Sequence, residues 1–258
     1  MGYWEDRQAA TQAALTKKNI KQTEKQLLKY YETCIHSLRG SFLNTYNHLK
    51  NSIESGREPT PADLYKLNKY WELQTQLQHD LQKLGDKQIA LYSKRFQEQW
   101  EDIYNAWAVT DDKHYSHMDK QAAQQMINEI WCADGQNWSN RVWGNTNKLQ
   151  QALNDDLIDC VLTGKNPAQL REMLMSEFSV SWSNADMIVR TEMAHIQTKA
   201  AEQRYKDMGV NKVKVWADED ERRCKECGKL HEKIFMIGEK IPVPAHPRCR
   251  CCIVPVIE

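Results

Sequence analysis

Glycine and proline are scarce in this chain, with ten and seven residues among 258. So few helix breakers exclude a loop-rich or collagen-like architecture and favour long regular elements. The chain also lacks net charge, because 35 basic residues balance 35 acidic ones. A protein without net charge has no global field for a polyanion, so any contact with nucleic acid has to come from a local patch.

Membrane and export signals are missing as well. No apolar run approaches the roughly 18 residues that a membrane span requires. The first residues, Met1-Gly2-Tyr3-Trp4-Glu5-Asp6, do not form a basic and then apolar leader. We therefore expect no membrane partner and a protein that stays in the cytosol of the cell that makes it.

Cysteine, in contrast, is concentrated near the C-terminus. Cys224-Lys225-Glu226-Cys227 is followed by His246-Pro247-Arg248-Cys249-Arg250-Cys251. Two thiols of a C-x-x-C turn can point at one ion, and tetrahedral zinc takes four such ligands. The five candidate metal ligands are Cys224, Cys227, His246, Cys249 and Cys251. The leading set is Cys224, Cys227, His246 and Cys251, with Cys249 as the competing fourth ligand.

Disulfides or buried core thiols are the alternatives to zinc at these positions. Disulfides are rare in a reducing compartment, and a chain without a leader is expected to stay in one. A structural zinc is favoured over a catalytic one, since ligands are in excess and a catalytic zinc keeps an open position. Cys252 follows Cys251 directly, so in an extended segment it points to the other face as an ordinary buried thiol.

Helical periodicity dominates the first half of the chain. An apolar stripe through residues 20–53 predicts one helix of about forty residues, and a second stripe over 64–107 predicts a helix that folds back on it as a hairpin. The break between them holds Thr60 as a helix cap and Pro61 as the first helical residue. Gly85 is the weak point of the second helix, where a kink or a division is expected.

Shorter helices are predicted at 115–130 and 149–161, the latter closed by Gly164. Two more are expected over 167–174, after Asn166, and over 183–208, with Ser183 and Asp186 as a capping box and Gly209 as the end. Six acidic residues balance six basic ones over 165–208, which excludes a groove-reading helix-turn-helix. Alternation predicts strands around Val213–Ala217, Ile234–Met236 and Ile253–Val254.

These elements together predict a mainly α protein with a small α+β tail. A long helical hairpin over residues 1–110 and a helical middle region over 111–180 precede a C-terminal domain over 181–258. In that last domain a compact β element is stapled by zinc.

Three local patterns have a structural and a functional interpretation. Lys18, Lys21, Lys25 and Lys29 form a basic stripe, which is read first as a solvated face and second as a contact with DNA or an acidic partner. Trp131, Trp138 and Trp143 are read as core anchors rather than base-stacking residues. Glu192 and His195 have the spacing of paired-metal ligands but no second such pair, so Glu192 is expected to be held by Arg190 or a backbone group and to orient the tail.

The tail resembles the phage Mu F-like minor head protein family. The matching positions are Arg190-Thr191-Glu192, Trp216-Ala217-Asp218, Asp220, Arg222, the C-x-x-C pair, Leu230, Phe235, Pro244, the H-P-x-C-x-C cluster and Pro255. The helical front, from Tyr3-Trp4 and Arg7 through Tyr70, is similar to phage head morphogenesis proteins. The sequence departs from the family at Leu230-His231-Glu232-Lys233, which allows His231 as a substitute ligand.

The resemblance implies a minor capsid protein of a tailed phage or prophage. Such a protein acts in head morphogenesis, associates with the portal protein and lies inside the head at the portal vertex of the virion after assembly in the host cytoplasm. Major capsid or scaffolding protein and non-specific DNA are further implied contacts, with several copies per virion and a role in genome packaging or ejection. Some relatives carry a toxin domain after the shared module, and none is expected in a chain that stops at Glu258.

An enzyme is the alternative function. A zinc-dependent nuclease or hydrolase acting on DNA or cell wall would use Glu192, Asp218 or Asp220 as acid or base, but no paired-histidine motif accompanies them. A thiol protease with Cys249 or Cys251 and His246 is disfavoured, because a histidine in the same turn is poorly placed as a general base. A third reading is a zinc-stapled adaptor without a phage role. We expect no enzymatic activity.

Overall fold

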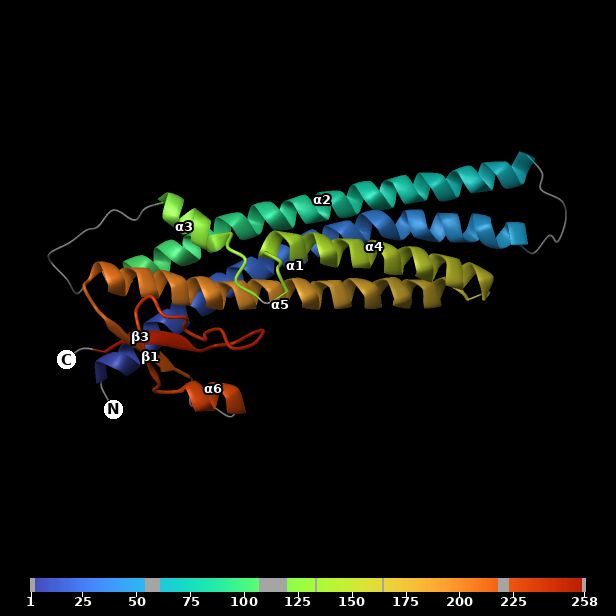
Figure 1. Ribbon diagram of the computed structural model, residues 1–258. Helices are drawn as coiled ribbons and strands as arrows, with labels where there is room; N and C mark the ends of the chain where they lie inside the picture. Colours follow the sequence, from blue (N-terminus) through green and yellow to red (C-terminus); the bar gives the residue numbers. More distant parts are fainter. Residues whose placement is uncertain are drawn as a thin grey trace. The chain divides into compact units, whose positions relative to one another are not determined.

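The computed structural model describes residues 3–53, 61–106, 120–132, 134–163, 165–217 and 223–256. Its elements are α1 (Tyr3–Ile53), α2 (Pro61–Asn105), α3 (Lys120–Ile127), α4 (Trp138–Leu162), α5 (Pro167–Asp207), β1 (Lys212–Trp216), α6 (Lys225–Leu230), β2 (Ile234–Met236) and β3 (Cys252–Pro255). The mainly α fold with a small C-terminal sheet is thereby confirmed (Figure 1). Within the described residues, no helix is long and apolar enough to cross a membrane.

Both predicted long helices are present, and α1 is longer than the sequence predicts. Helix α1 has 51 residues and begins at Tyr3, well before the apolar stripe at residue 20. Helix α2 begins at Pro61 as expected and continues through Gly85 to Asn105 without a division. Three predictions fall outside the described residues: the cap Thr60, the closing Gly164 and positions 115–119 of the helix predicted over 115–130.

The expected division of residues 167–208 into two helices is wrong, because α5 is one helix of 41 residues. Its start is as predicted: the Asn166 side chain accepts hydrogen bonds from the N–H groups of Ala168 and Gln169 at 2.9 and 3.0 Å. Its end is as predicted too, since Gly209 has φ +77° and donates to the Lys206 carbonyl. Ser183 and Asp186 lie inside the helix, where no glycine or proline interrupts it and packing outweighs the weak local signal.

The chain divides into two compact units, and α1, α2 and α5 each contribute to both. The second unit comprises residues 25–90 and 139–185. Three helical segments meet in it through a buried polar contact: the Asn145 Nδ2 of α4 donates to the Ser181 carbonyl of α5 at 2.8 Å, and Tyr31 of α1 lies 2.9 Å from the Ser181 hydroxyl. The expected boundaries near residues 110 and 180 stay a prediction.

The first unit comprises residues 1–24, 91–138 and 186–258. Buried amides and hydroxyls join its helices, since Thr16 donates to Gln197 at 2.7 Å and Asn19 donates to Gln99 at 2.9 Å. Buried polar groups cost free energy unless they are paired, so these contacts specify one register of α1 against α2 and α5. Trp138 is buried beside Phe96, as expected of a core anchor.

The three-stranded sheet belongs to this first unit. β1 is central and pairs antiparallel with β2 and β3, with Val213 opposite Phe235 and Val215 opposite Ile253. The outer edge of β3 is covered, because Gln12 of α1 and Tyr205 of α5 both donate to the Ile253 carbonyl. Cys252 is buried with Ala9 and Val254, which confirms its prediction as a core thiol.

Candidate metal centre

The C-x-x-C pair lies at the start of α6. Cys224 is the N-cap of this helix, and its sulfur accepts a hydrogen bond from the Cys227 N–H at 3.3 Å. One helical turn therefore brings both thiols to the same side. Cys227 is buried with 5% of its surface exposed, whereas Cys224 is half-buried.

The second part of the site is the turn from His246 to Cys251. The Cys249 N–H donates to the His246 carbonyl at 3.2 Å, and Arg248 adopts φ +59°. This left-handed residue reverses the chain, so that His246 and Cys249 can face the same point. Cys249 and Cys251 are both buried.

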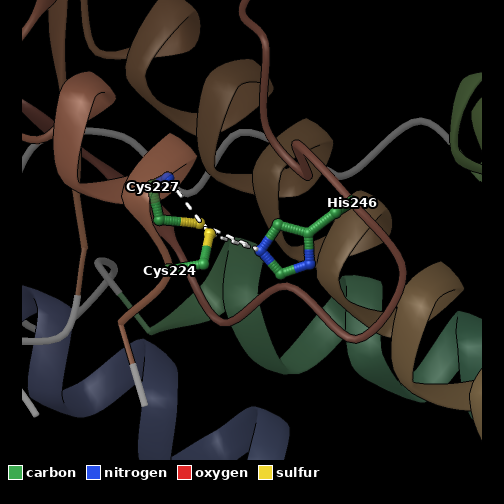
Figure 2. Close-up of side chains that lie close together, drawn as sticks. All are labelled: Cys224, Cys227 and His246. Atoms are coloured by element: carbon green, nitrogen blue, oxygen red, sulfur yellow. Dashed lines mark hydrogen bonds between the residues drawn. The ribbon is translucent and has the colours of Figure 1, made fainter. Parts of the chain in front are cut away.

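The two segments meet, and Figure 2 shows three of their side chains pointing toward one another. The His246 Nε2 lies 3.3 Å from the Cys224 sulfur and 3.1 Å from the Cys227 sulfur, and the sulfurs of Cys227 and Cys249 are 3.8 Å apart. Two thiolates at 2.3 Å from a tetrahedral zinc are about 3.8 Å apart, so this sulfur pair already has the required separation. These distances bring four of the five predicted ligands together, and Cys251 lies within 4.8 Å of the Cys227 and Cys249 sulfurs.

The five ligands form two groups that share Cys227. In each group the ligand atoms lie within 4.8 Å of one another: Cys224, Cys227 and His246 form one, and Cys227, Cys249 and Cys251 the other. A small cavity of about 50 Å³ is lined by the leading set of Cys224, Cys227, His246 and Cys251. Both fourth-ligand alternatives, Cys249 and Cys251, remain close enough to serve.

The hydrogen bonding of His246 fits a metal ligand. Its Nδ1 lies 2.8 Å from the Pro247 carbonyl oxygen, which can only accept. Nδ1 therefore carries a proton, and in the neutral ring Nε2 offers a lone pair on the side of the sulfurs. Metal-binding histidines commonly use such a carbonyl to fix the ring and its tautomer.

The thiols of the cluster differ in acidity because their surroundings differ. The hydrogen bond from Cys251 lowers the pKa of Cys249 to about 5, whereas burial raises the pKa of Cys227 to about 12. The same Cys249 contact raises the pKa of Cys251. Since metals bind thiolates, filling the site would release protons from the buried thiols, and the cation would compensate the negative thiolate charge that burial disfavours.

Helix α5 holds the His246–Cys251 turn in place. The Thr191 hydroxyl accepts a hydrogen bond from the Arg248 N–H at 3.1 Å and donates to the Met187 carbonyl at 2.7 Å. The Arg248 guanidinium lies 3.1 Å from the Asp186 carboxylate, which Arg190 also contacts. Arg190 further pairs with Glu24 of α1. The Arg190-Thr191-Glu192 motif thus has a structural role beside the cluster, with Thr191 making the direct contact.

Glu192 has a partner that the sequence did not predict. Its buried carboxylate accepts a hydrogen bond from the Trp131 indole N–H at 2.9 Å. The same indole stacks on His195, whose Nε2 lies 2.8 Å from a Glu129 carboxylate oxygen. Only the spacing of Glu192 and His195 is visible in the sequence, since Glu129 and Trp131 are more than sixty residues away.

His231 is not a substitute ligand in this arrangement. Its Nδ1 accepts a hydrogen bond from the Ala217 N–H at 3.2 Å, and its ring packs edge-on against Trp216. Neither group of potential ligands among the described residues includes it. Asp218 and Asp220, the proposed acid or base groups of the enzyme alternative, lie outside the described residues.

Fold and cluster together define a mainly helical protein with a Cys/His candidate metal centre beside a small antiparallel sheet. Residues 151–254 match the family described as phage Mu protein F like protein. The chain therefore carries a phage Mu protein F-like domain over these residues, as its tail resemblance predicted.

The chain is also similar to a curated protein, the NAD(+)--arginine ADP-ribosyltransferase EFV of Enterococcus faecalis (strain ATCC 700802 / V583). The two are 23% identical over 275 aligned positions, which cover 95% of this chain and 53% of that protein. The chain thus spans about half the length of this relative. No solved structure matches the chain.

Proposed function

We propose that this protein is a minor head protein of a tailed phage or prophage that associates with the portal protein at the portal vertex during head assembly. The match of residues 151–254 to the phage Mu protein F-like family carries the proposal. Long helices with exposed polar faces suit a protein that lies along a partner. DNA, major capsid protein and scaffolding protein are further candidate contacts inside the head.

The metal in this proposal is a structural zinc ion. Cys224, Cys227 and His246 would hold it together with Cys251 or Cys249, and it would staple α6 to the turn that docks on α5. The support is chemical: sulfur and imidazole ligands suit zinc, and ligands in excess leave no open position for a substrate. Of the three strands, β2 lies between these two segments in sequence and β3 directly follows the turn, so the stability of the small sheet should depend on the ion.

We further propose a non-enzymatic role, which the excess of potential ligands supports. The ADP-ribosyltransferase name of the similar protein suggests how to test it. Metal-loaded protein should neither transfer ADP-ribose from labelled NAD⁺ to arginine-containing acceptors nor cleave plasmid DNA or cell wall. If the natural protein catalyses one of these reactions and a folded Cys227→Ser variant does not, the metal site has a catalytic and not a structural role. Turnover that survives in Cys227→Ser would place an active centre elsewhere.

The first experiment is the metal content of purified protein, followed by co-purification with the portal protein of the same phage. We expect about one zinc per chain, as a single tetrahedral site requires, and retention of the portal protein. Cys227→Ser should lose the metal, while Cys132→Ser, a half-buried cysteine outside the cluster, should keep it. Protein that holds no metal, or that fails to retain the portal protein when loaded, would contradict the respective half of the proposal.

A further inference from the structure

A cleft of about 520 Å³ lies in the first unit, next to the metal centre. Its walls are residues 129–132, the part of α5 from Thr191 to Glu202, and the loop 240–247. His246 and Pro247 belong both to this loop and to the turn that carries the metal ligands. The volume is within the range of about 300–1,000 Å³ that is typical of ligand sites.

The polar floor of the cleft is a fixed histidine–carboxylate pair. His195 has 4% of its surface exposed, and its ring stacks on Trp131 with 4.3 Å between centroids and 4° between planes. Its Nε2 lies 2.8 Å from the Glu129 carboxylate, which is one-third exposed. Since an ionised carboxylate only accepts, Nε2 carries the proton and Nδ1 is left as an acceptor. Among the described residues, no group hydrogen-bonds this Nδ1.

The floor carries an ionised carboxylate. The hydrogen bond from His195 lowers the pKa of Glu129, so its carboxylate stays ionised at neutral pH. Lys199 is 3.5 Å from Glu202 and also contributes to the lowered pKa of Glu129, while Lys240 is an exposed cation on the loop side. The Thr198 hydroxyl donates its hydrogen to the Ala194 carbonyl and can otherwise only accept. The floor therefore offers acceptors, and its complement is a ligand that donates hydrogen bonds.

The loop side of the lining is apolar. Ile241, Pro242, Val243, Pro244 and Ala245 follow one another in the loop, and Trp131 also lines the cleft. Such a wall suits the aliphatic stem of a long side chain and the apolar residues beside it. A ligand that fits both parts has a cationic group that donates to the acceptors and an aliphatic chain that packs on the apolar residues. A lysine or arginine side chain of a peptide has both.

We propose that this cleft binds a basic side chain of a partner polypeptide, with its cationic head on Glu129 and its stem between Trp131 and the apolar loop. The inference does not depend on the phage role proposed above. Because His246 fixes one end of the loop, the metal should hold the cleft in its binding shape. Metal removal is then expected to weaken peptide binding without altering Glu129 or His195.

Two matched peptide pairs test the proposal by fluorescence anisotropy with metal-loaded, full-length protein. In one, the labelled peptide Ala-Leu-Lys-Leu-Ala is compared with its acetyl-lysine version, and in the other an arginine replaces lysine and citrulline is its neutral control. At least one basic peptide should bind saturably and at least about tenfold more tightly than its neutral partner, as expected for a charge-assisted hydrogen bond. Equal binding of the neutral peptides, or no binding of either basic peptide, would overturn the proposal.

Variants locate the site. Glu129→Gln keeps the shape of the side chain, removes its charge and should abolish the preference for the basic peptide. Asp6→Asn removes an exposed acid of the same unit and should leave the preference intact. A preference that persists in Glu129→Gln would place the basic residue elsewhere and sink the assignment. Should that variant fail to fold, the comparison of charged and neutral peptides on the natural chain still decides whether charge is recognised.

Discussion

At the scale of single residues, Gly85 is explained by a neighbour far along the chain. A Cβ built at this position would lie 2.3 Å from the Trp143 ring of α4, a distance that real side chains do not tolerate. The glycine therefore admits a close approach of α2 to an aromatic ring and does not divide the helix. Its helix-propensity cost of about 1 kcal/mol is accepted for packing.

Gly85→Ala should consequently destabilise the protein, although alanine is the better helix former. Overpacking costs about 1–3 kcal/mol, which outweighs the gain in propensity of about 1 kcal/mol. Gly40 is the matched control, because its Cβ would meet nothing within 4 Å on a helix of the same unit. Urea unfolding should show Gly85→Ala less stable and Gly40→Ala as stable as the natural chain or more so. The reverse order would refute the packing explanation.

Cys34 illustrates how burial sets reactivity. Burial raises the pKa of its thiol to about 12, whereas a free thiol titrates near 8.5. At pH 8 the folded protein should therefore resist alkylation at Cys34 by iodoacetamide, while the half-buried Cys132 reacts. Mass spectrometry of labelled peptides reads both sites in one sample.

The same shift has a consequence for stability, with a definite sign. The folded state favours the neutral thiol, so the contribution of Cys34 is complete below the unfolded pKa and is lost as the pH rises toward about 12. The free energy of unfolding of Cys34→Ala should therefore fall less than that of the natural chain when the pH is raised. Rapid labelling of Cys34 at pH 8 in folded protein would contradict this description of its surroundings.

At the scale of elements, α5 and the metal-binding turn are connected by Thr191. Thr191→Val keeps the branched shape but removes the acceptor of the Arg248 N–H and the donor to Met187. Loss of such a bond costs about 1 kcal/mol, which corresponds to a roughly fivefold to tenfold weaker metal affinity if the turn must be reordered on binding.

Competition with a chromophoric zinc chelator measures that affinity directly. Thr11→Val is the matched control, because among the described residues the Thr11 hydroxyl donates only to the Arg7 carbonyl of its own helix. Equal affinities in both variants would show that docking on α5 does not support the metal site.

At the scale of the whole molecule, metal removal should affect one unit selectively. The candidate ligands all lie in the first unit, and the segments they connect flank the short β2 strand. Without an ion, residues 223–256 lose the link between α6 and the His246 turn, so their amides should exchange faster in hydrogen–deuterium exchange. Residues 25–90 and 139–185 should keep their protection, since their core contains no candidate ligand. Uniform exchange before and after chelation would indicate that the ion does not stabilise the tail.

Much of the fold and of the metal centre was predictable because local signals suffice for them. Apolar periodicity predicts α1 and α2, and Asn166 and Gly209 fix the ends of α5. The spacing of Cys224, Cys227, His246, Cys249 and Cys251 alone predicts the cluster. Short-range chemistry decides these features, and such chemistry is written in neighbouring residues.

The tertiary structure decided what depends on residues distant in sequence. Ser183 and Asp186 suggest a helix start, yet packing makes α5 continuous. Gly85 has no room for a Cβ only because the Trp143 ring packs against it. The pair of His195 and Glu129, the Trp131 stack and the cleft above them arise from segments more than sixty residues apart. The sequence by itself determined most of the elements and the candidate metal ligands through spacing. Only the tertiary structure determined their neighbours, because contacts between distant segments follow from packing and not from local propensity.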